Sequence, residues 1–99
     1  MEIKNGASII GLRSEILLAY MIAEVVYEKY FAECVITEGT GGVDGKASLH
    51  YVGSAIDLRT RDFDEGVAEI VASEIRVKLN EQYDVVLESD HIHIEFQPK

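Results

Sequence analysis

Two stretches of the chain repeat apolar residues at helical spacing. In the first, from Ser14 to Tyr30, apolar side chains recur at steps of three and four residues, at Ile16, Tyr20, Ala23, Tyr27 and Tyr30. The second stretch, residues 61–82, has the same spacing at Val67, Ile70, Val71, Ile75 and Leu79. The pattern therefore predicts two amphipathic helices.

An acidic cluster stands at the beginning of the second stretch. Asp62, Asp64 and Glu65 precede its first apolar position. Negative side chains are favourable at a helix N-terminus. We therefore expect these residues to cap the second helix, and we do not assign them to a calcium site.

Four shorter segments have the composition and alternation of strands: residues 32–38, 53–60, 83–88 and 91–97. Only Ser89 and Asp90 separate the last two, which predicts an antiparallel hairpin. Residues 39–48, GTGGVDGKAS, contain four glycines without apolar periodicity and predict a long loop. This order of elements predicts an α+β fold, in which a small antiparallel β-sheet is packed with two helices.

Composition narrows the class of protein. The 99 residues are most simply one domain, spanning 1–99, and 47% hydrophobic residues can form a core that opposes disorder. The formal net charge of -9 argues against a nucleic-acid binder, which needs clustered Lys and Arg. The same charge would repel anionic polymers, including those of cell walls.

Cellular location is also constrained by the sequence. The lone Cys34 excludes an internal disulfide, and its apolar neighbours predict a buried, inert thiol. Residues 1–26 are interrupted by charges, so they fit neither a signal peptide nor a membrane span. We therefore expect no membrane association and a cytoplasmic location in the producing cell.

The three histidines are confined to two short segments. His50 lies in SLHYVGSAID, and His91 and His93 lie in SDHIHIE. Strand residues two apart face the same way, so His91, His93 and Glu95 should share one face of the last strand. Asp57 should project from another strand of the same sheet. Two imidazoles and a carboxylate with an open fourth position are typical of a catalytic zinc, whose bound water and polarising charge suit amide hydrolysis.

These two segments resemble a known enzyme family. SLHYVGSAID resembles the S-x-H-x-x-G-x-A-x-D motif, and DHIHIE resembles the D-x-x-H and H-x-H motifs, of the zinc D-alanyl-D-alanine carboxypeptidase family, which includes phage L-alanyl-D-glutamate endopeptidases. The order of motifs and elements fits from about Leu12 to Pro98. The resemblance implies a hedgehog/DD-peptidase-like fold and a zinc metallopeptidase that hydrolyses a peptidoglycan stem peptide. It also points to a phage or prophage endolysin that acts on the cell wall after release.

The resemblance assigns roles to individual residues. His50, Asp57 and His93 would bind Zn²⁺, Asp90 would be the general base, and His91 would steady the transition state. Asp90 must leave the regular strand for this role, since strict alternation points it away from His93. Its place in the inferred turn allows that.

Several of these assignments have alternatives. His91 could be the base in place of Asp90, and Glu88 is a third candidate. Glu95 could orient an imidazole or be a solvated carboxylate at the rim. Gly53 would allow a tight turn between the first two ligands.

Substrate recognition departs from the family pattern. Many members carry an arginine in a G-Y-R-type segment before the first ligand, but Lys46 is the only cation in the corresponding TEGTGGVDGKAS. Lys46, Ser48 and Arg59 are the candidate substrate-binding residues, with Arg61 as a further cation. Lys offers only a point charge, Ser48 could instead hydrogen-bond within the ligand loop, and Arg59 could form a salt bridge. The bond that is cleaved is therefore open.

Two other functions are compatible with the same motifs. One is a zinc-bearing binding module without peptidase activity, as in the hedgehog signalling domains of the same structural group. The other is a phage tail or virion component that uses the same fold. An intact Asp90 favours the enzyme. Beyond the peptidoglycan peptide, we expect a phage particle or delivery partner to bring the protein to the wall.

Overall fold

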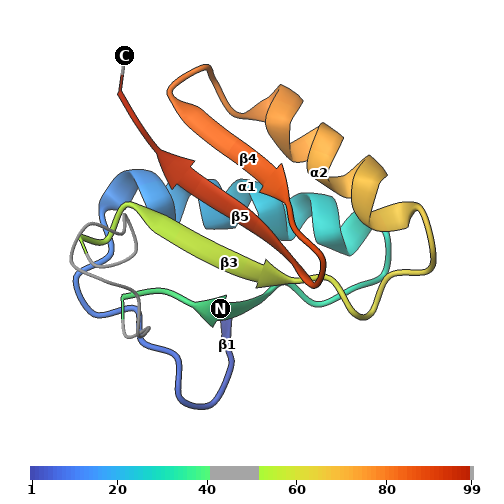
Figure 1. Cartoon of the computed structure of the whole chain (residues 1–99), viewed down its shortest axis with the longest axis horizontal. Coiled ribbons are helices and arrows are strands. Elements are labelled where there is room, and N and C mark those ends of the chain that lie inside the picture. The colour runs from blue at the N-terminus through green and yellow to red at the C-terminus, as the bar shows by residue number, and fades with distance from the viewer. Residues whose placement is uncertain (41–51, 99) are drawn as a thin grey trace.

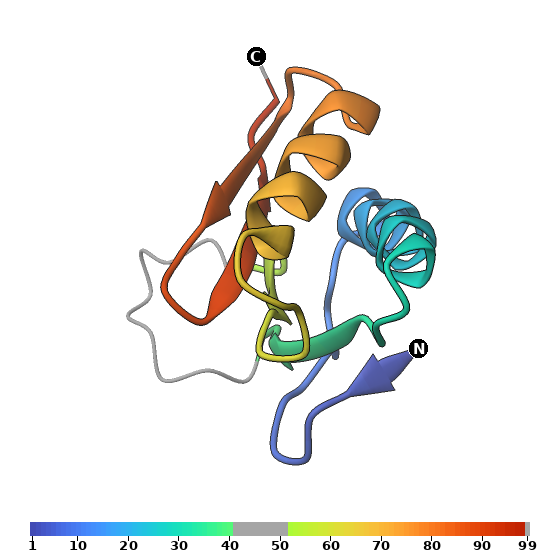
Figure 2. The same ribbon diagram turned by 90° about the vertical axis from the view of Figure 1, so that its right-hand side faces the viewer.

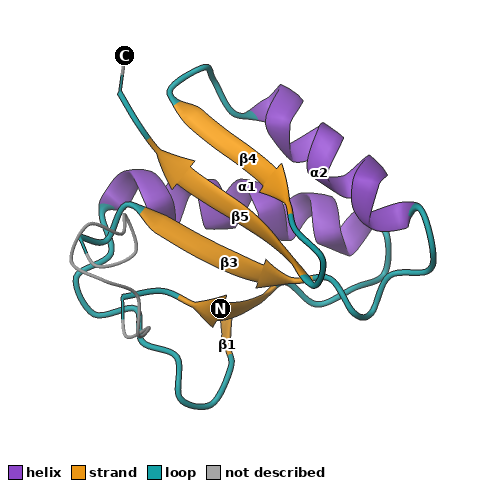
Figure 3. Ribbon diagram, viewed as in Figure 1, coloured by secondary structure: helices purple, strands orange, loops and turns teal. Residues whose placement is uncertain are grey.

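The sheet joins strands from both ends of the chain. The computed structural model describes residues 1–40 and 52–98. Its strands are β1 (Glu2–Ile3), β2 (Val35–Glu38), β3 (Ala55–Arg59), β4 (Tyr83–Leu87) and β5 (His91–Phe96). Within the described residues they form one sheet in the order β1-β2-β3-β5-β4 (Figures 1 and 3). The middle of the sheet is thus made by β3 and β5, the two strands that carry the predicted chemistry.

The strand directions correct part of the predicted fold. The pairs β2–β3, β3–β5 and β4–β5 are antiparallel, as expected, but β1 runs parallel to β2. The α+β class is confirmed, whereas a wholly antiparallel sheet is wrong. The sequence pattern missed β1 because this strand has only two residues, both exposed, and so shows no alternation of apolar and polar positions.

The predicted hairpin between β4 and β5 is confirmed. Leu87 is paired with Ile92, and the backbone N–H of Glu88 donates to the carbonyl of His91 at 2.8 Å. Ser89 and Asp90 therefore form a two-residue connection. Asp90 lies outside the regular strand, as the predicted base role requires.

Both helices, α1 (Ser14–Lys29) and α2 (Val67–Lys78), cover the same face of the sheet (Figure 2). Tyr20 and Tyr27 are buried as predicted, and their hydroxyls each donate at 2.8 Å, to the carbonyls of Cys34 and Arg59 respectively. Burial raises the pKa of Tyr20 to about 12. No helix in the described ranges is long and apolar enough to cross a membrane.

Alternation along the strands separates the core from the candidate site. The strand side chains that pack in the core cluster with the helices are Ile36, Ile56, Leu58, Tyr83, Val85, Ile92 and Ile94. Asp57 lies between Ile56 and Leu58 in the sequence, and His93 between Ile92 and Ile94, so both project to the opposite face. The apolar core thus holds β3 and β5 in register while one face stays available for polar side chains.

The second helix begins later than predicted. Its N-cap is Gly66, with φ 85°, and no side chain makes a capping hydrogen bond there. The expected capping by Asp62, Asp64 and Glu65 is therefore wrong. These residues lie in the preceding turns, where the carbonyl of Asp64 accepts the N–H of Val67 at 3.0 Å. A left-handed residue cannot be part of a right-handed helix, so the helix begins only at Val67.

The first helix ends in a Schellman motif. Phe31 N–H donates to the carbonyl of Glu28 at 3.0 Å, and Ala32 N–H donates to the carbonyl of Tyr27 at 3.1 Å. Phe31 has φ 61° and is 99% exposed. An aromatic side chain thus stands at a position that usually holds glycine.

Cys34, which the sequence predicted to be a buried thiol, lies directly before β2. It is buried, as expected, and burial raises the pKa of its thiol. The thiol is therefore protonated and unreactive at neutral pH.

The outer edge of the sheet at β4 is covered in part by α2. The guanidinium of Arg76 donates to the carbonyl of Val85 through Nη2 at 2.8 Å and Nε at 3.3 Å. In the register of the hairpin this carbonyl points away from β5. The contact therefore occupies an acceptor on the unpaired side of β4.

Candidate metal and catalytic site

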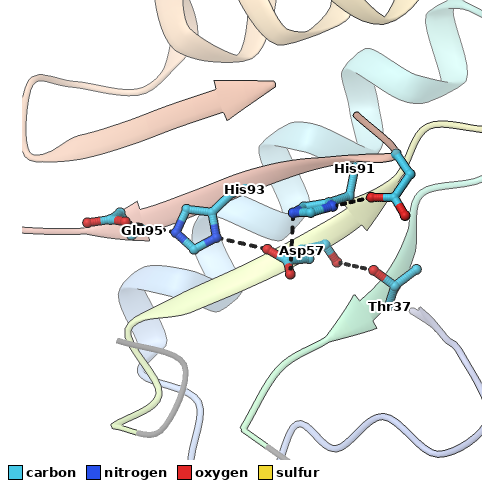
Figure 4. Close-up of polar contacts among 6 residues, drawn as sticks. Thr37, Asp57, His91, His93 and Glu95 are labelled. Carbon is cyan, nitrogen blue, oxygen red and sulfur yellow. Dashed lines mark hydrogen bonds and ion pairs between the residues drawn. The ribbon is translucent and has the colours of Figure 1, made fainter. Parts of the chain in front are cut away.

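Two of the three predicted metal ligands face each other across the central strands. Asp57 of β3 and His93 of β5 are direct partners in the antiparallel register. The Oδ1 atom of Asp57 lies 2.8 Å from Nδ1 of His93 (Figure 4). Asp57 is only 9% exposed. The structure therefore brings together a largely buried carboxylate and an imidazole that are 36 residues apart in the sequence.

The second ring nitrogen of His93 meets another carboxylate. Its Nε2 atom lies 2.8 Å from Oε1 of Glu95, which shares the same face of β5 (Figure 4). Only the imidazolium form can donate hydrogen bonds to both carboxylates. The hydrogen bond to Asp57, with a further contribution from Glu95, raises the pKa of His93 to about 9 against the opposing effect of burial. Glu95 thus orients an imidazole and is not merely a rim carboxylate.

His91 lies between two carboxylates, those of Asp90 and Asp57. Its Nδ1 atom is 2.6 Å from Oδ1 of Asp90, and its Nε2 atom is 3.6 Å from Oδ2 of Asp57 (Figure 4). The Asp90 side chain is 83% exposed, whereas that of His91 is 28% exposed. Asp90 therefore contacts the outer nitrogen of His91 and turns the inner nitrogen toward Asp57. The two residues form one unit, which the sequence alone could not establish.

Neighbouring elements hold the backbone of β3 in place. The hydroxyl of Tyr27 donates to the carbonyl of Arg59 at the end of the strand, and the Tyr27 ring packs on Phe63 at a centroid distance of 4.8 Å. On the other side, Thr37 Oγ1 donates to the carbonyl of Asp57 over a long 3.4 Å (Figure 4). Thr37 was not predicted as part of the site, because a threonine in a short strand gives no signal beyond β propensity.

Gly53 shapes the chain just before β3. It has φ 79°, and a Cβ atom there would lie 2.2 Å from the carbonyl oxygen of Gly11. The carbonyl of Gly53 accepts the N–H of Arg13 at 3.0 Å. The predicted requirement for glycine is confirmed, and close contact with residues 11–13 adds a second reason for it.

Three predicted site residues, Lys46, Ser48 and His50, lie outside the described residues. The metal-ligand role of His50 and two of the three substrate-binding assignments therefore stay predictions. Among the residues that the structure does describe, no group of three His, Cys, Asp or Glu side chains could hold a metal ion. Asp57 and His93 supply two donors, and the predicted set would be completed by His50.

The geometry of this pair can be compared with the requirements of zinc. Tetrahedral coordination with bonds of about 2.0–2.2 Å places two ligand atoms roughly 3.3 Å apart. The Asp57–His93 separation of 2.8 Å is that of a hydrogen bond. If the two residues bound a cation, the distance between Asp57 Oδ1 and His93 Nδ1 would therefore increase by about half an ångström, and Nδ1 would lose its proton. The donor types and their facing positions fit zinc.

A cavity of about 310 Å³ lies beside this polar cluster. Asp57, Asp90 and His91 line it together with Arg59, so four of the five predicted site residues that the structure describes reach it or lie at its wall. Lys4 of the β1 segment also lines the cavity and was not predicted. Glu88, the third candidate base, is exposed at the end of the hairpin.

Comparison with known proteins adds no family assignment. No family model matches this sequence, and no curated protein or solved structure is significantly similar to it. The resemblance therefore depends on the two motifs.

Proposed function

We propose that this chain is a zinc-dependent metallopeptidase of the hedgehog/DD-peptidase-like group, which hydrolyses a peptide bond in peptidoglycan stem peptides. The observation that carries the proposal is the direct opposition of Asp57 and His93 at 2.8 Å. These residues occupy the second and third ligand positions of the two motifs. Chain folding brings them together on a sheet face that also holds His91, Asp90 and a cavity.

The ligand role of His93 agrees with its second contact. Asp57 and His93, together with His50, would hold the zinc, which supplies a Lewis acid and lowers the pKa of bound water. If Nδ1 were a ligand of the metal, Nε2 would keep its proton and could donate it to Glu95, whose Oε1 lies 2.8 Å away. Such a carboxylate fixes the tautomer and the orientation of a ligand imidazole.

Proton transfer belongs to His91 and Asp90 as a pair. Asp90 can accept the Nδ1 proton of His91, which in the neutral ring leaves Nε2 unprotonated beside Asp57, and His91 lines the cavity. His91 can then take a proton from a nucleophilic water and return it to the leaving amine. This geometry favours His91 as the base and Asp90 as the residue that positions it, which was the alternative to Asp90 acting directly.

The decisive experiment combines zinc analysis with peptidoglycan digestion. Reconstituted wild-type protein should hold one zinc per chain and release muropeptides whose masses identify the cleaved bond. Asp57→Asn should lose both zinc and activity. His91→Gln should retain zinc but lose roughly a hundredfold or more in rate, the usual contribution of a general base. Asp64→Asn, the same change in an exposed turn, should retain both.

The outcomes separate the alternatives. Stoichiometric zinc without any muropeptide release favours the binding module or the virion component. Protein that binds no zinc after reconstitution contradicts the metallopeptidase. Equal activity losses in Asp90→Asn and His91→Gln support their action as one unit, since residues of one unit are not additive.

A further inference from the structure

The helical layer, on the side of the sheet opposite the candidate site, carries a second set of apolar side chains that face outward. Each of these side chains is at least 52% exposed: Leu18, Met21, Val25, Ile70 and Val77. The inward stripes of the same two helices are buried in the core. α1 is therefore apolar on both of its faces, a pattern typical of a helix that is covered on both sides. Exposed apolar residues that adjoin one another mark a surface for association.

Two open grooves run over this apolar surface. The first, of about 500 Å³, follows the outer side of α2 and is lined by Glu69, Ile70, Ser73, Glu74, Val77 and Lys78. The second, of about 410 Å³, lies beside it on α1 and is lined by Leu18, Met21, Ile22, Val25 and Lys78. Because Lys78 belongs to both grooves, they form one continuous surface, which we call the helical face.

The helical face is neutral, although the chain has a formal net charge of -9. The charged residues that line its grooves are Glu69, Glu74 and Lys78. Lys29 forms an ion pair with Glu74 at 3.1 Å, so two carboxylates are balanced by two cations. Two copies that meet through this face therefore bring no local excess of negative charge together.

The order of residues along α2 is self-complementary. Glu69 and Lys78 lie at opposite ends of its groove, about 14 Å apart along the helix axis. Neither forms an ion pair within the part of the chain that the structure describes. Reversal of the helix direction exchanges Glu69 with Lys78, so each charge meets its opposite. It also exchanges Ile70 with Val77, so apolar side chains meet.

We propose that the helical face binds a second copy of this chain, with the two α2 helices antiparallel about a two-fold axis near Ser73. In an interface of this symmetry the same residues of both copies contact one another. At the common crossing angle of about −50°, Glu69 of each copy is brought beside Lys78 of the other. Ser73 is small and allows the helices to approach closely where they cross. The oblique crossing also carries the N-terminal end of each α2 over the groove on α1 of the other copy.

The candidate metal site stays accessible in such a dimer. Both helices cover the same face of the sheet (Figure 2), whereas Asp57 and His93 project from the opposite face. The two sites would therefore lie on the outside of the dimer, away from the interface. Dimerisation is thus independent of the proposed function.

Charge reversal tests the pairing directly. Sedimentation equilibrium of the full chain measures its mass as a function of concentration, and wild type should approach the mass of two chains. Glu69→Lys and Lys78→Glu should each dimerise roughly tenfold more weakly or worse, because the two-fold axis repeats each repulsion. An equimolar mixture of these two variants should regain dimerisation, since every pair across the mixed interface then joins opposite charges.

Two further variants separate loss of contact from a change of net charge. The Val77 side chain is 86% exposed in the single chain, so Val77→Ser should leave the fold intact and weaken dimerisation roughly tenfold. Glu33→Lys changes the net charge as Glu69→Lys does, at an exposed position that lines neither groove. It should dimerise no more weakly than wild type. Circular dichroism establishes that each variant is folded.

Each outcome bears on one part of the proposal. A single-chain mass at all concentrations up to roughly 1 mM overturns the second copy as the occupant and leaves the face to a different protein. Dimerisation that is unchanged in Glu69→Lys and Lys78→Glu overturns this face as the interface. Weakened dimerisation that the mixture does not restore overturns the antiparallel arrangement.

Discussion

His93 is the residue whose protonation couples the site to the stability of the fold. Its pKa in the folded chain is about 9, against an ordinary value of 6.5, because Asp57 and Glu95 both accept hydrogen bonds from its ring. A raised pKa stabilises the folded state fully below pH 6.5. That stabilisation is lost as the pH rises from 6.5 through about 9.

The corresponding prediction concerns metal-free protein in a chelator. Between pH 6 and pH 9.5, we expect wild type to lose up to roughly 3 kcal/mol of unfolding free energy beyond any loss in His93→Gln. Urea denaturation at several pH values measures the difference. Parallel pH profiles for the two proteins would show that the ring is not held as a cation.

The sequence pattern predicted the arrangement of the site residues on β5 better than it predicted the contacts around them. Alternation along β5 correctly placed His91, His93 and Glu95 on one face, because backbone geometry alone determines that. The contact between Asp90 and His91 depends on side-chain rotamers in a two-residue connection, which no periodicity reports. Lys4 reaches the cavity through a parallel pairing of β1, and nothing in its local sequence indicates this.

At the scale of elements, the turn before β3 is determined by the backbone of Gly53. Gly53 and Gly66 both have positive φ, but only Gly53 lacks room for a Cβ atom. The two positions therefore separate the cost of the backbone conformation from the cost of a steric clash.

We expect Gly66→Ala to destabilise the protein by about 1 kcal/mol, from the left-handed conformation alone. Gly53→Ala should cost roughly 1–3 kcal/mol more, since its Cβ would meet the Gly11 carbonyl. Chemical denaturation of the three proteins tests this order. Equal losses at the two positions would show that the chain around Gly11 moves away without cost.

At the C-terminal end of α1, a change to glycine should stabilise the protein, the opposite of the two changes away from glycine. Phe31 holds the left-handed position of the Schellman motif and is 99% exposed, so its side chain contributes no buried contact. Replacing it relieves the backbone without loss of packing.

Phe31→Gly should therefore raise the unfolding free energy by about 1 kcal/mol and the Tm by roughly 4–8 °C. Phe31→Ala is the control, because it removes the aromatic ring but keeps a Cβ atom at positive φ. An equal increase of the Tm in both variants, measured by thermal denaturation, would assign the effect to loss of the exposed ring.

The hydrophobic pattern predicted elements well where they are long or half-buried. Both helices and the β4–β5 hairpin follow from apolar spacing, since burial against the sheet requires it. The start of α2 could not be predicted in this way. Acidic residues favour a helix N-terminus, but the left-handed Gly66 delays the start of the helix until Val67, after these residues.

At the scale of the whole molecule, the net charge of -9 affects how the chain meets an anionic substrate. Repulsion between like charges is long-ranged in dilute buffer and is largely screened beyond about 10 Å at 0.1 M salt. Soluble peptide fragments experience little of this field.

If the proposed activity is confirmed, raising the salt from 0.01 to 0.15 M should increase the rate on intact anionic cell walls severalfold. The rate on soluble muropeptides should stay nearly constant or fall, because salt also screens Lys4, Arg59 and Arg61, the cations that line the cavity. Turbidity of wall suspensions and chromatography of fragments measure the two rates. A salt response of the same size on both substrates would exclude long-range repulsion as its cause.

The contact between Arg76 and Val85 has a consequence for concentrated solutions of the protein. An uncovered strand edge invites the backbone of another molecule to extend the sheet, which is a common first step of aggregation. Here a guanidinium already occupies an outward acceptor of β4. The Arg76 side chain therefore opposes the pairing of another molecule along the edge of β4, and a modification that neutralised Arg76 would remove this protection against aggregation.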